Sequence, residues 1–439
     1  MRRVLPLLSA LAVIGLGGVW AAAERAPVVV TPGSEQSYRV AVQRFAVLDA
    51  GGRPRLADDF RKDVQEALEF SGVFRQVSDD AFLEPVTTAP GREDAALDCP
   101  NWSQIGADAL VEGELARRPD GYEITFRVWD AERCRRLARR RYRQAGGDLG
   151  STARRLADDV VEAFTGIRGV TSTEIAFVSD RGGNKEIFVM NADGSDARAA
   201  TANRSINNFP SWSRDGDSIL YTSYRFRDRP LIFVSTRKGR PGRVLGGLGE
   251  ERSQYRGVFG PNGRVAVVMS DGNAPDLYSA TLEGRSVRRL TRNRAIDVSP
   301  AWSPDGKRIA FVSDRSGNPN LYVMNADGSG TRRLTYDGNY NTNPTWSPDG
   351  LWIAYETRVN NQFDVWLIDP EGEVNVPLVT HPRSDEGPSW SPNSRKLVFS
   401  STRRGLADLY VIDRDGSNLR RITGSNGNNT SPAWGPFKQ

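Results

Sequence analysis

Short apolar runs alternate with polar turns through the second half of the chain, and residues 299–335 show one complete unit of this pattern. Apolar runs rich in aromatic and β-branched residues are separated there by Asp-, Asn- and Gly-rich turns, which is typical of antiparallel hairpins. We expect four strands in the unit, at residues 299–302, 308–313, 320–325 and 332–335.

An aromatic residue near the start of the unit recurs at intervals of roughly 43–47 residues. These aromatic anchors are Trp212, Phe259, Trp302, Trp346, Trp390 and Trp434. A period of about 40–50 residues with four strands in each unit is typical of the blades of a β-propeller. The alternative is an open solenoid, which needs polar capping repeats at its ends.

The repeat begins and ends part-way through a unit. Residues 174–178 (EIAFV) match a second strand without a first strand before them, and residues 431–437 (SPAWGPF) match a first strand with nothing after them. Because the two fragments complete each other, we expect the C-terminal strand to pair with the first blade and close a ring of six. Closure hides the sheet edges that an open stack would expose.

Residues 38–168 mix strand-like alternation with helical spacing. A helix is expected at 57–69, where Phe60, Val64 and Leu68 share a face, and another at 152–164, with Ser151 as its N-cap. Strands are expected at 38–45, 74–77, 109–115, 122–129 and 137–142. The 439 residues therefore predict an α/β N-terminal domain (38–168) followed by an all-β six-bladed β-propeller (169–439).

Residues 1–23 predict a secretory signal peptide, because Arg2 and Arg3 precede an apolar run and residues 21–23 (AAA) fit a cleavage site. A membrane anchor is the alternative, but glycines interrupt the run, which is shorter than the ~20 apolar residues of a span. Removal of the peptide lowers the formal charge from +5 by the two arginines, so the mature chain is only mildly basic.

Cys99 and Cys134 are the only cysteines. An even pair in an exported protein favours a disulfide, and two buried thiols are the alternative. With one histidine elsewhere in the chain, the pair does not supply the four ligands of a zinc site. We expect neither a metal nor another cofactor.

Seven arginines lie between residues 133 and 143. We interpret them as a solvated turn and an edge strand protected by charge, with an anion-binding face as the alternative. Because the chain is predicted to be exported, a nucleic-acid partner is not expected.

Catalytic chemistry finds little support in the residues. The chain has no Gly-x-Ser-x-Gly elbow, and its only histidine, His381, lies in a loop with no obvious nucleophile beside it. We expect no catalytic residues.

The predicted signal peptide, the small α/β domain and the blades with Trp-Ser-Pro-Asp-Gly starts resemble the TolB family of the Tol–Pal system. The junction at 164–169 (FTGIRG) and the ending at 432–439 (PAWGPFKQ) are also similar to that family. Two blades depart from the pattern, at 259–263 (FGPNG) and at 224–230 (YRFRDRP).

The resemblance implies a periplasmic, non-enzymatic adaptor that binds the lipoprotein Pal through the propeller and TolA through the N-terminal segment 24–37. Such an adaptor maintains outer-membrane integrity and envelope constriction during cell division. Other envelope proteins are further candidate partners, and contact with a membrane is expected only through partners. The alternative is a periplasmic propeller enzyme, a hydrolase or lyase acting at the channel mouth.

The residues five positions before the anchors are all amides or carboxylates: Asn207, Gln254, Asp297, Asn341, Asp385 and Asn429. We expect them around one mouth of the channel, either as a hydrogen-bonding ring for a partner or only as turn builders. The resemblance implies that Pal docks at this mouth. Further candidate contacts are Asn208, Asn343, Glu386 and Thr430. Asp297 and Asp385 alone are too few to predict a cation site.

Overall fold

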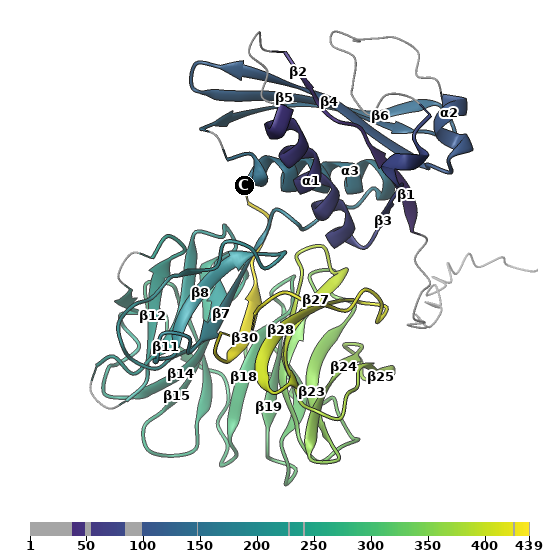
Figure 1. The fold of residues 1–439 in the computed structure, drawn as a ribbon. Coiled ribbons are helices and arrows are strands. Elements are labelled where there is room, and N and C mark those ends of the chain that lie inside the picture. Colours follow the sequence, from purple (N-terminus) through teal and green to yellow (C-terminus); the bar gives the residue numbers. More distant parts are fainter. Residues whose placement is uncertain are drawn as a thin grey trace, which may run out of the picture.

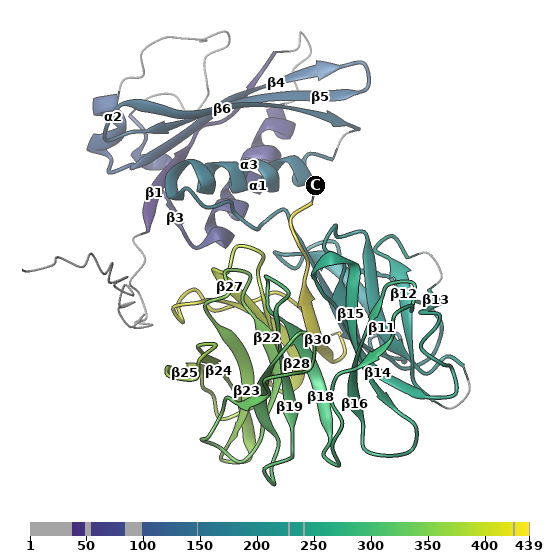
Figure 2. The ribbon, with the colours of Figure 1, turned by 180° about the vertical axis from the view of Figure 1, so that it is seen from behind.

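The computed structural model describes residues 37–48, 54–83, 99–146, 148–226, 229–239, 242–424 and 426–438. The predicted signal peptide, and all but the last residue of the predicted partner segment 24–37, lie outside the described residues. An α/β domain sits above a six-bladed propeller (Figures 1 and 2), so the predicted fold class is confirmed. Within the described ranges, no helix has the length and apolar character needed to cross a membrane.

A mixed sheet forms one layer of the N-terminal domain, in the order β3-β1-β4-β5-β6, with β2 beside β4. Its strands are β1 (Tyr38–Val42), β2 (Ala46–Val47), β3 (Phe74–Gln76), β4 (Ala109–Arg118), β5 (Gly121–Asp130) and β6 (Arg135–Ala145). Strand β1 runs parallel to β3 and β4, whereas β4, β5 and β6 form an antiparallel meander with β6 at the edge.

Two helices, α1 (Pro54–Ser71) and α3 (Gly150–Thr165), cover one face of this sheet (Figure 2). Their apolar stripes, which include Phe60 and Leu156, form a buried core with the sheet. Helix α3 begins before Ser151, so the predicted N-cap is wrong. Leu149 occupies the cap position, and the Asp148 carboxylate accepts the Gly150 N–H at 3.0 Å instead.

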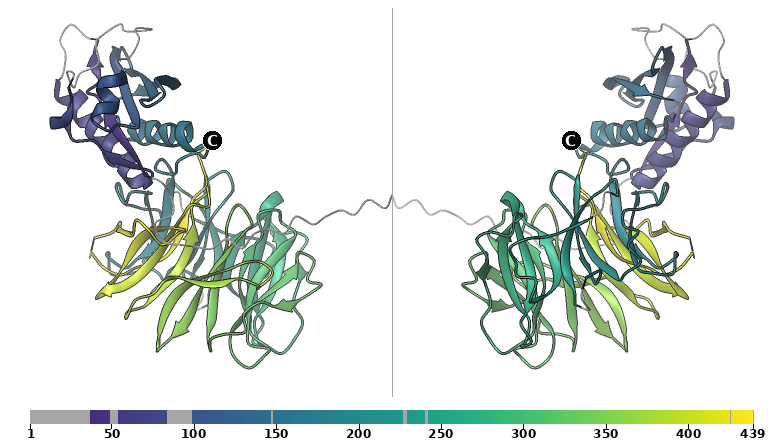
Figure 3. Two further views of the ribbon diagram at one scale, coloured as in Figure 1. Left: turned by 90° about the vertical axis from the view of Figure 1, so that its right-hand side faces the viewer. Right: turned by 90° about the vertical axis from the view of Figure 1, so that its left-hand side faces the viewer.

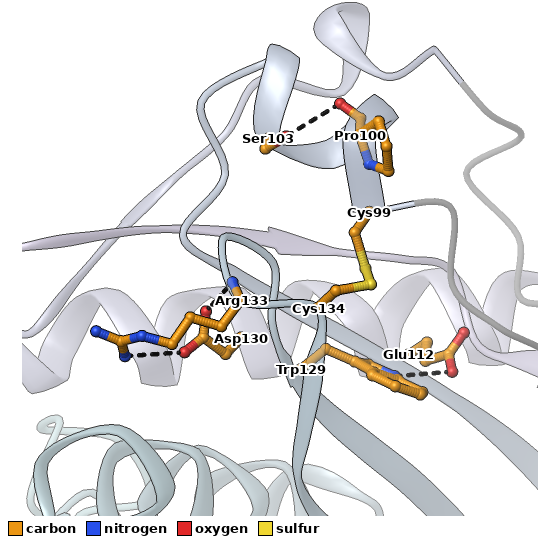
Figure 4. The surroundings of a disulfide bond; sticks show 8 residues. All are labelled: Cys99, Pro100, Ser103, Glu112, Trp129, Asp130, Arg133 and Cys134. Carbon is orange, nitrogen blue, oxygen red and sulfur yellow. Dashed lines mark hydrogen bonds and ion pairs between the residues drawn. A yellow bond between two sulfur atoms is a disulfide. The ribbon is translucent and has the colours of Figure 1, made fainter.

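The short helix α2 (Cys99–Gln104), missed at the sequence level, packs on the other side of the sheet, and a 3₁₀ turn, η1 (Asp79–Ala81), follows β3. Figure 4 shows a disulfide between Cys99, the first residue of α2, and Cys134, in the turn between β5 and β6. The two Cα atoms are 5.5 Å apart. The bond ties α2 to the end of the meander.

Six four-stranded antiparallel sheets surround a central channel. Figure 3 shows the propeller from two further sides, below the N-terminal domain. The innermost strands are β10 (Asn207–Trp212), β14 (Ser253–Phe259), β18 (Asp297–Trp302), β22 (Asn341–Trp346), β26 (Asp385–Trp390) and β30 (Asn429–Trp434). The second strands are β7 (Glu174–Ser179), β11 (Ser218–Ser223), β15 (Arg264–Ser270), β19 (Arg308–Ser313), β23 (Ile353–Val359) and β27 (Lys396–Arg404).

The third and fourth strands form the outside of the ring. The third strands are β8 (Glu186–Asn191), β12 (Leu231–Thr236), β16 (Asp276–Thr281), β20 (Asn320–Asn325), β24 (Gln362–Ile368) and β28 (Leu406–Asp413). The outer strands are β9 (Arg198–Ala199), β13 (Arg243–Val244), β17 (Arg288–Arg289), β21 (Arg332–Arg333), β25 (Asn375–Val379) and β29 (Arg420–Arg421). A 3₁₀ turn, η2 (Pro261–Gly263), joins β14 to β15.

The last strand of the chain completes the first blade. Strand β30 pairs with β7, with Asn429 opposite Ser179 and Trp434 opposite Ile175. The Trp434 indole is 7% exposed, and its N–H donates to the Thr173 hydroxyl at 2.8 Å. The sheet order of this blade is therefore β30-β7-β8-β9.

The N-terminal domain contacts the end of the ring at which the anchors lie. Phe70, at the end of α1, belongs to the apolar core of the first and last blades, and the charged ends of Lys396 and Arg420 each lie 5.8 Å from its ring centroid. Asn393, just after anchor Trp390, donates to the Arg168 carbonyl at 2.9 Å. We call this end of the channel the upper end, and the end where the innermost strands begin the lower mouth.

Candidate functional site: the central channel and its lower mouth

The six polar residues at or near the start of the innermost strands are fully buried. All six of them, Asn207, Gln254, Asp297, Asn341, Asp385 and Asn429, are 0% exposed. Five of the six side chains bond the loops that lead into the strands, and the sixth, Asp385, bonds Arg403 instead. The Asp297 carboxylate, for example, accepts from the Asn293 side chain at 2.6 Å, and the Asn341 amide donates to the Asp337 carbonyl at 2.9 Å. We call these six residues the strand-initial ring.

Arginines from the turns after the second strands hold three members of this ring in place. Arg315 donates to the Ser313 hydroxyl at 2.8 Å and to Asp297 at 2.9 Å. The guanidinium also lies over the rings of Phe311 and Tyr322, at 5.3 and 4.9 Å from their centroids. Arg181 and Arg403 repeat this arrangement on Asn429 and Asp385. The Ser-x-Arg sequence that recurs at 179–181, 313–315 and 401–403 is therefore a structural clamp.

The expected hydrogen-bonding ring is consequently not accessible to a partner in this structure. Most of its polar atoms bond loop backbone, neighbouring side chains or arginines, while Asn341 Oδ1 and Asp385 Oδ2 are buried without a hydrogen-bond partner in the described part of the chain. Asp297 and Asp385 are each paired with an arginine at 2.9 Å. Among the described residues, no group of three or more His, Cys, Asp or Glu residues is placed to hold a metal ion.

The neighbouring positions are open to solvent to different degrees. Glu386 is exposed, while Asn208 and Thr430 are half-buried. Although Glu386 is exposed, the surrounding protein partly removes its carboxyl group from water, which raises the pKa of that group. The nearby Asp385 adds to this shift. These neighbours, unlike the strand-initial ring, present side chains at the lower mouth.

Large apolar side chains gather in the loops of the lower mouth. Those that are more than one-third exposed are Ile206, Tyr224, Phe226, Tyr255, Ile296, Tyr336, Tyr340 and Leu406. They lie before the innermost strands, at the start of those strands, or in the turns after the second strands. Clustered exposed apolar groups of this kind are typical of protein-binding surfaces. We call these eight residues the apolar rim.

The middle of each innermost strand carries a bulge, at which the pairing with the second strand shifts register. In five blades, a residue with positive φ is followed there by a proline. These residues are Phe209, Ser299, Asn343, Gly387 and Ser431, with φ between 49° and 65°. The third blade has Arg256 and Gly257 at these positions instead. We call the five residues together with Arg256 the bulge ring.

The third blade also changes the contacts of the anchors. The Trp212 and Trp390 indoles donate to the carbonyls of Ala433 and Thr345 in the preceding blades, at 3.0 and 3.1 Å. The indole N–H of Trp302, which follows the third blade, is buried without a hydrogen-bond acceptor. Within the departure at 259–263, Gly260 lies so close to this indole that a Cβ there would be 2.6 Å from Trp302 Cε2.

Arg256 reaches across the channel. Its guanidinium donates to the Asn343 side chain at 2.5 Å, and the Asn343 amide donates to the Glu356 carboxylate at 2.7 Å. The Gly387 backbone N–H also donates to Glu356. Burial raises the pKa of Glu356 to about 7, against the opposing effect of these donors. Sequence reasoning missed both Arg256 and Glu356. A signal for Arg256 was present, because it is followed by glycine where the other five blades have a proline.

The other candidates from the sequence lie away from this channel. The His381 ring nitrogen accepts the Arg383 backbone N–H at 3.0 Å, an ordinary loop contact. In the basic cluster, Arg143 pairs with Glu123 at 3.4 Å and Arg140 with Asp159 at 3.7 Å. Strand β6 is at the edge of its sheet, in keeping with the interpretation of the cluster as a protected edge.

Comparison with known proteins identifies the family to which this chain is similar in both domains. The TolB beta propeller domain matches residues 161–438, and the TolB amino-terminal domain matches residues 26–137. The chain belongs to the TolB family. The resemblance noted in the sequence is thereby confirmed.

Two relatives and one solved structure show the extent of the similarity. The Tol-Pal system protein TolB of Anaeromyxobacter dehalogenans is 37% identical over 306 residues, which are 69% of this chain and 68% of the relative. That of Bordetella pertussis is 32% identical over 274 residues, 62% of this chain and 59% of the relative. The crystal structure of TolB from Acinetobacter baumannii has a TM-score of 0.75 at 23% identity and covers 93% of this chain and 98% of that one.

Proposed function

We propose that this chain is a periplasmic adaptor of the Tol–Pal system that binds the lipoprotein Pal at the lower mouth of the propeller. Membership of the TolB family supports a role in the Tol–Pal system. The apolar rim is the observation that supports the lower mouth as the binding surface. The loops there carry exposed aromatic side chains, and side chains of this kind supply much of the free energy of protein–protein binding.

The rim also combines apolar and polar groups as a docking surface requires. Tyr255 and Tyr340 each present a ring and a hydroxyl, 37% and 39% exposed, at the start of their innermost strands or just before it. Glu386 adds a carboxylate on the sixth blade, beside half-buried Thr430 on the neighbouring strand. Tyrosine suits such surfaces because one end of the side chain is apolar and the other forms hydrogen bonds.

The Pal proposal is tested by calorimetric titration of the mature chain with soluble Pal. We expect the double variant Tyr255→Ala and Tyr340→Ala to weaken binding by about tenfold or more. The charge reversal Glu386→Arg is expected to weaken it as well. The matched control is Leu351→Ala, which removes a side chain of similar exposure, 40%, from an upper loop. Unchanged affinity in both rim variants, with an unchanged melting temperature, would place the Pal site elsewhere.

We further propose that residues 24–37 bind TolA. This proposal rests on the family, because the segment lies almost wholly outside the described residues. Deletion of residues 24–33 is expected to abolish TolA binding and to leave Pal binding intact, as measured with the two partners separately. Retained TolA binding after the deletion would remove the proposal.

A further inference from the structure

The upper part of the central channel is a cavity of about 420 Å³. Its walls are apolar rings from several blades: the prolines Pro210, Pro300, Pro344, Pro388 and Pro432, and the six aromatic anchors. It extends from the bulge ring to the loops after the anchors, which include Pro348 and Pro392. A cavity of this size and lining is in the range of small-molecule sites.

Arg256 brings a positive charge to the inner end of this cavity. The Arg256 side chain lies deep within the propeller, and the part of its surface that remains accessible faces the lumen of the channel. The group lies over the Phe209 ring, at 5.6 Å from the centroid, and donates one hydrogen bond to Asn343. Phe209 and Asn343 line the same cavity.

The charge of Arg256 has no direct counterion among the described residues. No described carboxylate lies within the 4.0 Å of an ion pair with its guanidinium. Glu356 is reached only through Asn343, whose side chain accepts from Arg256 and donates to Glu356. By contrast, the comparable arginines Arg315 and Arg403 of the clamps each bind a carboxylate at 2.9 Å.

We propose that this cavity binds a carboxylate carried on a short apolar stem, with Arg256 as the recognition residue. A guanidinium offers a planar fork of donors that matches the two oxygens of a carboxylate. One donor of Arg256 is engaged by Asn343, which orients the group and leaves the others for a ligand. Proline and tryptophan rings suit the apolar stem and exclude water, which strengthens the ionic contact.

The chemistry of the site is the same for a free carboxylate and for a glutamate side chain that enters from a partner. The site extends upward from the bulge ring and the apolar rim lies below that ring, so the proposal goes beyond Pal binding at the lower mouth. The two sources are separated by the choice of probe.

The test is calorimetric titration of the mature chain with benzoate and with its neutral counterpart benzamide. A second pair of probes is the blocked peptide proline-glutamate-proline and the same peptide with glutamine. We expect saturable binding of benzoate and at least about tenfold weaker binding of benzamide, the loss that follows from one charge-assisted contact. Binding of the glutamate peptide as well would show that the cavity admits a side chain, and its failure that the ligand is a free carboxylate.

Three variants locate the contact. Arg256→Gln removes the charge and keeps an amide that can donate to Asn343, so benzoate binding should fall at least about tenfold. Asn343→Asp places a carboxylate beside an intact Arg256 and should weaken binding similarly. Arg285→Gln is the control, because Arg285 is exposed in the turn between β16 and β17 and does not line the cavity. We expect it to change affinity by less than about twofold.

Either of two results would overturn the proposal. One is the absence of saturable binding of both carboxylate probes to the wild-type chain. The other is benzoate affinity that is unchanged in Asn343→Asp and in Arg256→Gln. The melting temperature of each variant is measured alongside, and because Asn343→Asp leaves Arg256 in place, an unfolded Arg256→Gln protein does not prevent the test.

Discussion

The strand-initial ring and the bulge ring lie two positions apart on the same six strands, yet they have opposite properties. The first is uniformly polar, 0% exposed and bonded mainly to its own loops and to arginine side chains. The second contains phenylalanine, arginine, serine, asparagine and glycine, and part of it faces the cavity. A buried polar position accepts only a narrow set of residue types, because the side chain must form hydrogen bonds with the groups around it. A position that faces a lumen has no such constraint, and it is at this variable position, rather than at the repeated one, that we propose ligand binding in this propeller.

Truncation after Thr423 removes one member of each ring and should have the largest effect. Without β30, the first blade loses its innermost strand and the burial of Trp434, a side chain that covers ~150–250 Å². We expect an aggregated or unfolded product in size-exclusion chromatography and thermal melting. Truncation after Lys438 is the control and should behave like the full chain. A monomeric Thr423 truncation with an unchanged melting temperature would contradict closure of the ring by β30.

Substitution within the strand-initial ring should cost stability rather than binding. Asp385→Ala leaves the Arg403 guanidinium, whose side chain is 14% exposed, without its carboxylate, which we expect to cost about 3 kcal/mol in urea denaturation. The control is Ser299→Gly in the bulge ring, where φ is 52° and glycine is readily accommodated. Its effect should be within about 1 kcal/mol. Weaker Pal binding by Asp385→Ala at unchanged stability would show that this ring contacts the partner after all.

The carboxyl group of Glu356 should make stability depend on pH. Its pKa rises from 4.5 to about 7 in the folded protein, so protonated Glu356 favours folding at low pH. That contribution is present below pH 4.5 and is lost as pH rises through 7. Glu356→Gln removes the dependence, and between pH 5 and 8 its stability should gain about 2–3 kcal/mol relative to wild type. Glu371→Gln, at a side chain that is 59% exposed, is the control in the same urea titrations. Parallel pH profiles of Glu356→Gln and wild type would show that Glu356 titrates normally.

The smallest effect is expected at the apolar rim. Tyr336 is 72% exposed, and Arg333 lies over its ring at 5.0 Å. Tyr336→Ser should change the free energy of unfolding by less than about 0.5 kcal/mol, because an exposed side chain loses few contacts. A larger loss of unfolding free energy in urea denaturation would mean that the apolar rim helps to hold the fold together. It would then not be a surface that is free for binding.

Much of the fold could be predicted from local patterns. The strands at Arg308–Ser313 and Asn320–Asn325 begin and end where the apolar runs do, because alternating strands with Gly and Asn turns are encoded locally. The cap of α3 was misplaced since Ser151 and Asp148 both offer a capping side chain, and only the path of the preceding chain selects between them. Helix α2 was missed because six residues that begin with Cys99 carry too little periodicity.

The candidate site was harder to predict than the fold, because its residues are distant in the sequence and come together only in the folded propeller. The sequence by itself determined the repeat, the number of blades and the complementary fragments at 174–178 and 431–437, since strand periodicity and turn chemistry act over a few residues. Only the tertiary structure decided which polar positions are buried and which face the lumen. Arg256, Asn343 and Glu356 come from the third and fifth blades, and their contact exists only because the curvature of the ring turns these two alternate blades toward the same channel.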